Sequence, residues 1–319
     1  MVKNPNTMKK QFLFPVVLFV SCVIAFSSCQ KEENNNNNTI PPETEAKAQS
    51  DDQHFFSTGI DALANDANLM LESSGAFSGR GQGIQSLICD ATVVVDTTSN
   101  PRTLTITYNG TNCIGVYTRT GVVTLSMAQN VHWKDVGAQI SVNVQNLKIT
   151  RLIDNKSITI NGSQTYTNQS GGLLLFLPTL NTITHLINSD GISVKFDDNT
   201  QRTWKVARKH VFTYSNGVVL TVSGNHSENG VDNISEWGTN RFGGAFTTST
   251  TVPLVIRQDC YFRITAGEVL HTTPHITASV IFGLDENGNP ASCPGIGLYY
   301  MKLNWAITGG STHSLILPY

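Results

Sequence analysis

The chain has 319 residues, of which 21 are Lys or Arg and 23 are Asp or Glu, so its net charge is −2 at pH 7. This balance offers no basic patch that could neutralise phosphates, so we expect no nucleic-acid partner. The region 76–319 is long enough for one large domain or two small ones.

Residues 1–28 have the pattern of an export signal. Lys9 and Lys10 precede an apolar run over residues 12–26, and two serines follow it. A basic start, a short apolar stretch and small residues before a cleavage point are typical of secretory signal peptides. The run is shorter than the roughly 20 residues that span a bilayer, which argues against a transmembrane anchor. We therefore predict a lipoprotein signal peptide over 1–28.

Cys29 directly follows the two serines. This junction resembles the lipobox of bacterial lipoproteins, which implies that Cys29 is acylated and becomes the first residue of the mature protein. Cys22 is the weaker candidate, because the apolar run continues past it. The resemblance implies a membrane partner through an N-terminal lipid anchor and a location at the outer membrane.

Residues 29–50 are polar and include five consecutive asparagines at 34–38. Such a segment cannot bury enough apolar surface to fold, so we predict a disordered tether. The Lys-Glu-Glu sequence at 31–33 looks like the surface-export signal of Bacteroidota lipoproteins and implies exposure at the cell surface. The alternative is a generic charged linker on a protein that faces the periplasm.

Residues 51–75 form the one helix that the sequence predicts with a clear pattern. Ser50 and Gln53 have the spacing of a capping box, and Gly75 is a plausible end. We expect a short N-terminal helix whose apolar stripe packs on the domain, with a free partner-binding helix as the alternative. The residues at helical spacing are Ile60, Leu63, Ala64, Ala67, Met70 and Leu71.

From Cys89 onward, apolar and polar residues alternate in the manner of strands, and the longest alternation covers residues 299–307. Val144 and Leu147 fall on opposite parities, which predicts a β-bulge between them. No helix-length crossover separates the strands. We therefore predict an all-β fold, an antiparallel meander that forms a sandwich, a curved open sheet or a partial barrel. Candidate hairpin turns are Asn109-Gly110, Asn161-Gly162, Asp190-Gly191, Asn216-Gly217, Asn229-Gly230 and Asn287-Gly288.

Four further cysteines fall into two local pairs, Cys89 with Cys113 and Cys260 with Cys293. Both intervening stretches have a strand, a turn and a second strand, which we interpret as two duplicated halves of the domain. In an oxidising compartment this layout predicts two local disulfides. A four-cysteine zinc site is the rival, but the close spacing of most zinc sites is missing. We expect no metal and no cofactor.

The same region carries a family resemblance. An uncharacterised group of Bacteroidota cell-envelope lipoproteins looks similar in the order of several segments, namely 89–97, 112–113, 119–123, 246–247, 253–255 before Cys260, and 282–283 before Cys293. The resemblance covers roughly residues 50–310. It implies an exported, acylated, β-rich protein with paired cysteines, and it implies no particular activity.

The chain holds weak signals for site chemistry. His271 and His275 lie four residues apart, but the proline between them argues against a metal-binding helix. Residues 285–289 resemble the start of a calcium loop, although a hairpin turn explains them as well. Asp197 and Asp198 could be paired carboxylates for glycoside hydrolysis, or simply a turn. Common catalytic motifs are missing from the sequence.

The best candidate for a recognition surface is the glycine-rich segment 237–244. Trp237, Asn240, Arg241 and Phe242 could stack on and hydrogen-bond a glycan or a protein ligand. The alternative is a hairpin corner with Trp237 in the core. Separately, Thr97 lies in an Asp-Thr-Thr sequence that matches the O-glycosylation pattern of Bacteroidota.

The sequence thus favours an acylated lipoprotein with a non-enzymatic binding or structural role in the cell envelope. The alternative is a hydrolase of an extracellular polymer such as a glycan. A cleft that holds two carboxylates about 5–9.5 Å apart would favour the hydrolase, and an exposed aromatic face would favour binding.

Overall fold

The computed structural model describes residues 40–80, 88–291, 293, 298–307 and 310–319. The predicted signal peptide, Cys29 and the first part of the predicted tether lie outside the described residues. Residues from Ile40 to Tyr319 belong to a single compact unit. That unit is mostly antiparallel β-structure with a helix near its N-terminus, which confirms the predicted fold class.

Fifteen strands in the described part of the chain join one antiparallel sheet. The helical elements are α1 (Pro42–Ser73), α2 (Gly75–Ser78), η1 (Leu174–Phe176), α3 (Leu177–Leu180) and η2 (Gln258–Cys260). The strands are β1 (Ala91–Asp96), β2 (Arg102–Thr111), β3 (Tyr117–Met127), β4 (Ala138–Arg151), β5 (Ser157–Asn168), β6 (Thr182–Lys195), β7 (Gln201–Tyr214), β8 (Val218–Gly224), β9 (His226–Glu228), β10 (Val231–Thr239), β11 (Ala245–Arg257), β12 (Arg263–Thr272), β13 (Ile276–Leu284), β14 (Tyr300–Ile307) and β15 (Thr312–Pro318).

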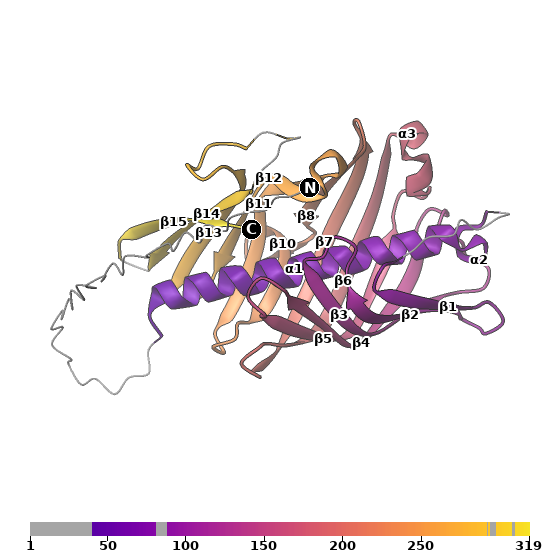
Figure 1. The fold of residues 1–319 in the computed structure, drawn as a ribbon, viewed down its shortest axis with the longest axis horizontal. Coiled ribbons are helices and arrows are strands. Elements are labelled where there is room, and N and C mark those ends of the chain that lie inside the picture. Colours follow the sequence, from indigo (N-terminus) through magenta and orange to yellow (C-terminus); the bar gives the residue numbers. More distant parts are fainter. Residues whose placement is uncertain (1–39, 81–87, 292, 294–297, 308–309) are drawn as a thin grey trace, which may run out of the picture. The chain divides into compact units, whose positions relative to one another are not determined.

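The strand order is that of a meander. Strands β1 to β7 pair in sequence, and so do β10 to β15. Strand β8 pairs with both β7 and β11, while β10 joins those same two strands, so β7, β10, β11 and β8 form a small closed circuit. The result is a curved sheet, part of which closes into a small barrel. Helix α1 crosses the concave side of the sheet (Figure 1).

The predicted bulge between Val144 and Leu147 is present, because the β4–β5 register shifts there. Asn146 adopts a left-handed φ of 50° at this point. Its carbonyl lies so close to Gly121 of β3 that a Cβ on Gly121 would stand 2.5 Å away. Only glycine fits beside the bulge, which therefore bends the sheet at a fixed place.

Half of the predicted turns are correct. Asn216-Gly217, Asn229-Gly230 and Asn287-Gly288 lie between or beyond strands. The other three pairs are wrong as turns, since they lie inside β2, β5 and β6. At Gly162 of β5 and Gly191 of β6 the register shifts, and a Cβ on Gly162 would come within 3.1 Å of the Gly191 carbonyl oxygen. These glycines permit close strand approach instead of chain reversal.

Helix α1 is longer than predicted and starts earlier. It begins at Pro42, so residues 42–50 are helical and not part of a disordered tether. Pro42 suits the first helical turn, and Glu43 and Glu45 in that turn complement the helix dipole. The early start also lets Ala46 pack in a core with β11 to β14. The helix ends at Ser73, two residues before the predicted Gly75.

Two cores hold the helix and the sheet together. The apolar stripe of α1 packs with inward residues of β2 to β7, as predicted. A second core under β8 and β11 to β14 contains Met301, Leu303 and Trp305, so the alternation over residues 299–307 does mark a buried face. The interpretation of two duplicated halves stays a prediction.

Candidate functional site

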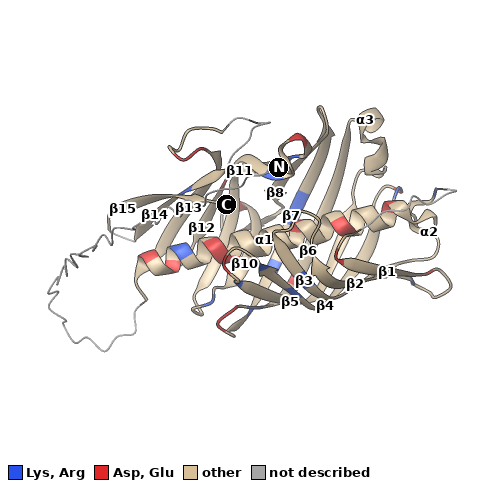
Figure 2. Cartoon of the chain, in the orientation of Figure 1, with Lys and Arg blue, Asp and Glu red and all other residues tan. Residues whose placement is uncertain are grey.

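Acidic residues recur along α1 (Figure 2), and arginines from strands and a loop form ion pairs with four of them. Each pair joins a helix carboxylate to a guanidinium from a different strand or loop, so the helix is fixed at several points along its length. The pairs are Asp51 with Arg151, Asp52 with Arg241, Asp61 with Arg208, and Asp66 with Arg119.

The most deeply buried pair lies where α1 crosses β7 and β10. Arg208 Nη1 lies 2.6 Å from Asp61 Oδ1, and Arg208 Nε donates to Glu236 Oε1 at 2.5 Å. The guanidinium also contacts Ser57 Oγ, and His210 Nε2 lies 3.1 Å from Asp61 Oδ1. The Arg208 side chain is only 2 % exposed and that of Glu236 is fully buried. We call Asp61, Arg208, His210 and Glu236 the ionic cluster.

The two central groups of the ionic cluster, Asp61 and Arg208, stabilise each other's charge. Burial alone would raise the pKa of Asp61, but the charge of Arg208 and the contact with His210 reverse this and hold it at about 2. Burial lowers the pKa of Arg208, whereas Asp61 and Glu236 raise it above its ordinary value. A carboxylate with so low a pKa is a poor proton donor near neutrality, which argues against a role as a catalytic acid. The contacts of the cluster instead hold α1 against β7 and β10.

Asn240 and Arg241 of the predicted recognition loop also contact α1. Asn240 accepts backbone hydrogen bonds within the loop and donates to Glu45 at 2.9 Å. Arg241 donates to both carboxylate oxygens of Asp52, at 2.7 and 2.5 Å, and to Asp197 at 3.0 Å. Their polar atoms therefore hold the loop against the helix.

Trp237 lies elsewhere, on the outer face of β10. Glu236 points toward α1, so its neighbour Trp237 must point to the opposite face of the strand. There its ring stacks on that of His226, with centroids 4.4 Å apart, and Lys205 Nζ lies 5.9 Å from the ring. Phe242 is half-buried in the loop. Trp237 thus lies on the outer face of β10, apart from Asn240, Arg241 and Phe242 in the loop. A ligand-binding role for these four residues stays a prediction.

Both predicted disulfides are present. Cys89 joins Cys113 with a Cα–Cα distance of 5.2 Å, and Cys260 joins Cys293 at 5.8 Å. The first bond encloses β1 and β2, and the second encloses β12 and β13. Because the cysteines bond in twos, a four-cysteine zinc site is wrong for this structure.

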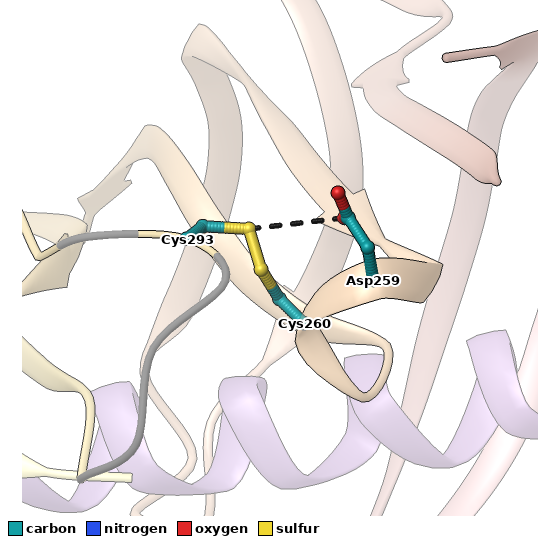
Figure 3. Close-up of side chains that lie close together, drawn as sticks. All are labelled: Asp259, Cys260 and Cys293. Atoms are coloured by element: carbon teal, nitrogen blue, oxygen red, sulfur yellow. Dashed lines mark hydrogen bonds between the residues drawn. A yellow bond between two sulfur atoms is a disulfide. The ribbon is translucent and has the colours of Figure 1, made fainter. Parts of the chain in front are cut away.

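One disulfide has a carboxylate beside it. Asp259 lies next to the Cys260–Cys293 bond, and their ligand atoms all fall within 4.8 Å (Figure 3). The sulfur atoms bond to each other, however, and Asp259 accepts hydrogen bonds from Arg257 at 2.9 and 2.6 Å. In this arrangement the three residues act as a crosslink and an ion pair.

The other sequence candidates are dispersed. His271 is buried on β12 with its Nδ1 2.9 Å from Thr248 Oγ1, and burial lowers its pKa to about 4, whereas His275 lies in a turn. Asp285 accepts backbone hydrogen bonds inside a hairpin turn, as the simpler interpretation held.

Asp197 and Asp198 both lie near Arg241, at 3.0 and 3.6 Å. Arg241 therefore forms ion pairs with both of the carboxylates that the sequence offered as candidates for glycoside hydrolysis. Thr97 is exposed in the turn after β1, and its glycosylation stays a prediction.

The ionic cluster was not predicted from the sequence, although one pattern on β7 indicated it. Trp204, Val206 and Phe212 share a parity on β7, and Arg208 and His210 have that same parity. Charged residues at inward positions of a strand are rare unless they are paired.

Comparisons with protein-family models, with curated proteins and with solved structures found no match. No relative therefore supplies a function for this chain. Among the described residues, none of the helices is long and apolar enough to cross a membrane.

Proposed function

We propose that this chain is an acylated lipoprotein of the outer membrane, exposed at the cell surface, with a non-enzymatic binding or structural role in the envelope. The observation that carries the proposal is the Ser-Ser-Cys junction ending at Cys29, directly after the apolar run 12–26. The sequence resemblance to Bacteroidota envelope lipoproteins and the Lys-Glu-Glu sequence at 31–33 support the same location.

The two disulfides support export, because such bonds form and persist in oxidising compartments. They brace opposite parts of the sheet, which suits a protein that works outside the cytoplasm. The rest of the described domain gains its stability from its two apolar cores and the ion pairs along α1.

The ion pairs that the acidic residues form with arginines support a role without catalysis. A glycan hydrolase needs two carboxylates that face its substrate about 5–9.5 Å apart. Asp61 and Glu236 instead share Arg208 beneath α1, and Asp197 and Asp198 share Arg241. We therefore favour the binding or structural role over the hydrolase.

Labelling with a clickable palmitate analogue tests the anchor in a bacterium that processes lipoproteins. We expect label on the natural chain and on Cys22→Ala, which serves as the matched control. Cys29→Ala should lose the label and accumulate as a larger precursor. Label that survives in Cys29→Ala would reject the proposal.

Protease treatment of intact cells tests orientation, and full protection of the domain would place it on the periplasmic side.

A further inference from the structure

Two neighbouring hairpin loops expose a group of aliphatic side chains. The β2–β3 loop presents Ile114 and Val116, and the β4–β5 loop presents Leu152 and Ile153. We call these four residues the apolar tip. Their exposed fractions are 70, 42, 42 and 90 %. Large aliphatic side chains gathered in water mark an interaction surface more often than single exposed ones do.

The apolar tip has a fixed shape. Leu152 donates a backbone hydrogen bond to the Val116 carbonyl at 3.0 Å, which joins the two loops. Asn112 Oδ1 accepts from the backbone N–H groups of Val116 and Tyr117, at 3.0 and 3.1 Å. The Cys89–Cys113 disulfide braces the first loop. The exposure of the four side chains is thus built into ordered loops.

Helix α1 begins at this same end of the strands. Tyr117 pairs with Arg151, so both loops lie at one end of the sheet. Arg151 and Lys156, which flank the β4–β5 loop, contact Asp51 of α1 at 2.9 and 2.7 Å. Asp51 is nine residues after Pro42, or about 14 Å along the helix axis.

The other end of α1 lies at the opposite end of the strands. Glu72 accepts a backbone hydrogen bond from Leu174 at 2.5 Å, in the β5–β6 connection. Helix α1 therefore begins at the same end of the strands as the apolar tip, although its first turn packs beside β11 to β14. The two positions 29 and 42 are 13 residues apart, which limits their separation to about 45 Å.

We propose that the apolar tip inserts into the lipid leaflet that holds the acyl chains of Cys29. This inference rests on the proposed lipid anchor, which would confine this end of the domain near the bilayer and raise the effective concentration of lipid around it. Aliphatic side chains without a surrounding pocket suit the hydrocarbon boundary, where buried apolar area provides the binding energy.

The charges beside the tip predict which lipids it accepts. Arg151 pairs with Asp51 and with Asp154, and Lys156 pairs with Asp51. These two cations and two anions balance, so the contact requires no anionic headgroup. We expect the tip to insert into zwitterionic vesicles and to stay inserted at high salt.

A tryptophan at the tip tests this directly. Acylated Ile153→Trp is reconstituted with phosphatidylcholine vesicles whose acyl chains are brominated, because bromine quenches tryptophan that enters the hydrocarbon. The matched control is Val136→Trp, a 78 % exposed site in the β3–β4 loop at the opposite end of the strands. Emission of the natural chain, measured in the same vesicles, is subtracted from both.

We expect bromine to quench the added emission of Ile153→Trp and to leave that of Val136→Trp unchanged. Protein that floats with the vesicles but shows no quenching at position 153, or shows it at position 136 instead, would overturn the inference while the lipid anchor stands. Natural chain that fails to float with the vesicles would refute the proposed anchor itself, and this inference with it.

Discussion

Replacement of Arg208 by methionine would test how the ionic cluster holds α1 to the sheet. Methionine keeps an unbranched chain but removes the charge, which leaves Asp61 and Glu236 buried without their cation. Removal of one partner of a buried ion pair costs about 3–5 kcal/mol. Burial raises the pKa of Asp61, and its value of about 2 in the folded protein shows that Arg208 and His210 more than offset the cost of burying this carboxylate.

Urea unfolding at pH 7, followed by tryptophan fluorescence, measures this loss. Lys47→Met is the matched control, because the Lys47–Glu43 pair lies on the same helix in solvent and should leave stability nearly unchanged. Addition of Asp61→Asn and Glu236→Gln to Arg208→Met removes the stranded charges and should restore much of the stability. A loss below about 1 kcal/mol for Arg208→Met, or a triple variant no more stable than the single one, would refute this reasoning.

Three further predictions concern acid stability, the second core and the crosslinks. The pKa of Asp61 is lowered in the folded state, so its contribution is present above pH 3.8 and is lost as the pH falls through about 2. Unfolding free energies between pH 2 and pH 5 should therefore fall less steeply for Asp61→Asn, and an unchanged slope would contradict the assignment. Trp305→Ala should cost about 3–5 kcal/mol, since Trp305 is buried in the second core, and an unchanged melting temperature would show that this face is exposed. Non-reducing peptide mapping should find Cys89 bound to Cys113 and Cys260 bound to Cys293. The double variant Cys89→Ser/Cys113→Ser should lose about 3–4 kcal/mol of its free energy of unfolding. Crosslinks between the pairs, or four free thiols, would count against both statements.

Local patterns predicted the strands well, because alternation reports directly which face of a strand is buried. Met301, Leu303 and Trp305 are one example, and the bulge between Val144 and Leu147 is another. Asn-Gly pairs were less informative, since a glycine can serve either a turn or a close approach of two strands. Gly162 serves the second purpose, and only the neighbouring β6 reveals this.

The helix start and the ionic cluster depend on contacts that are distant in sequence. Residues 42–50 look like a polar linker until Ala46 packs against β-strands more than 200 residues away. The inward positions of Arg208 and His210 indicate buried polar side chains on β7. The identity of their partner Asp61, 147 residues earlier for Arg208, follows from how the whole helix lies across the sheet. No local pattern contains that information.

The most direct test of the lipid anchor is mass spectrometry of the mature N-terminus. The chain is purified from the membranes of an expressing bacterium, and its intact mass and N-terminal peptide are measured. We predict that the protein begins at Cys29 and that this residue carries the acyl chains. A mature chain that begins at any other residue, or that begins at Cys29 without lipid, would contradict the proposed function.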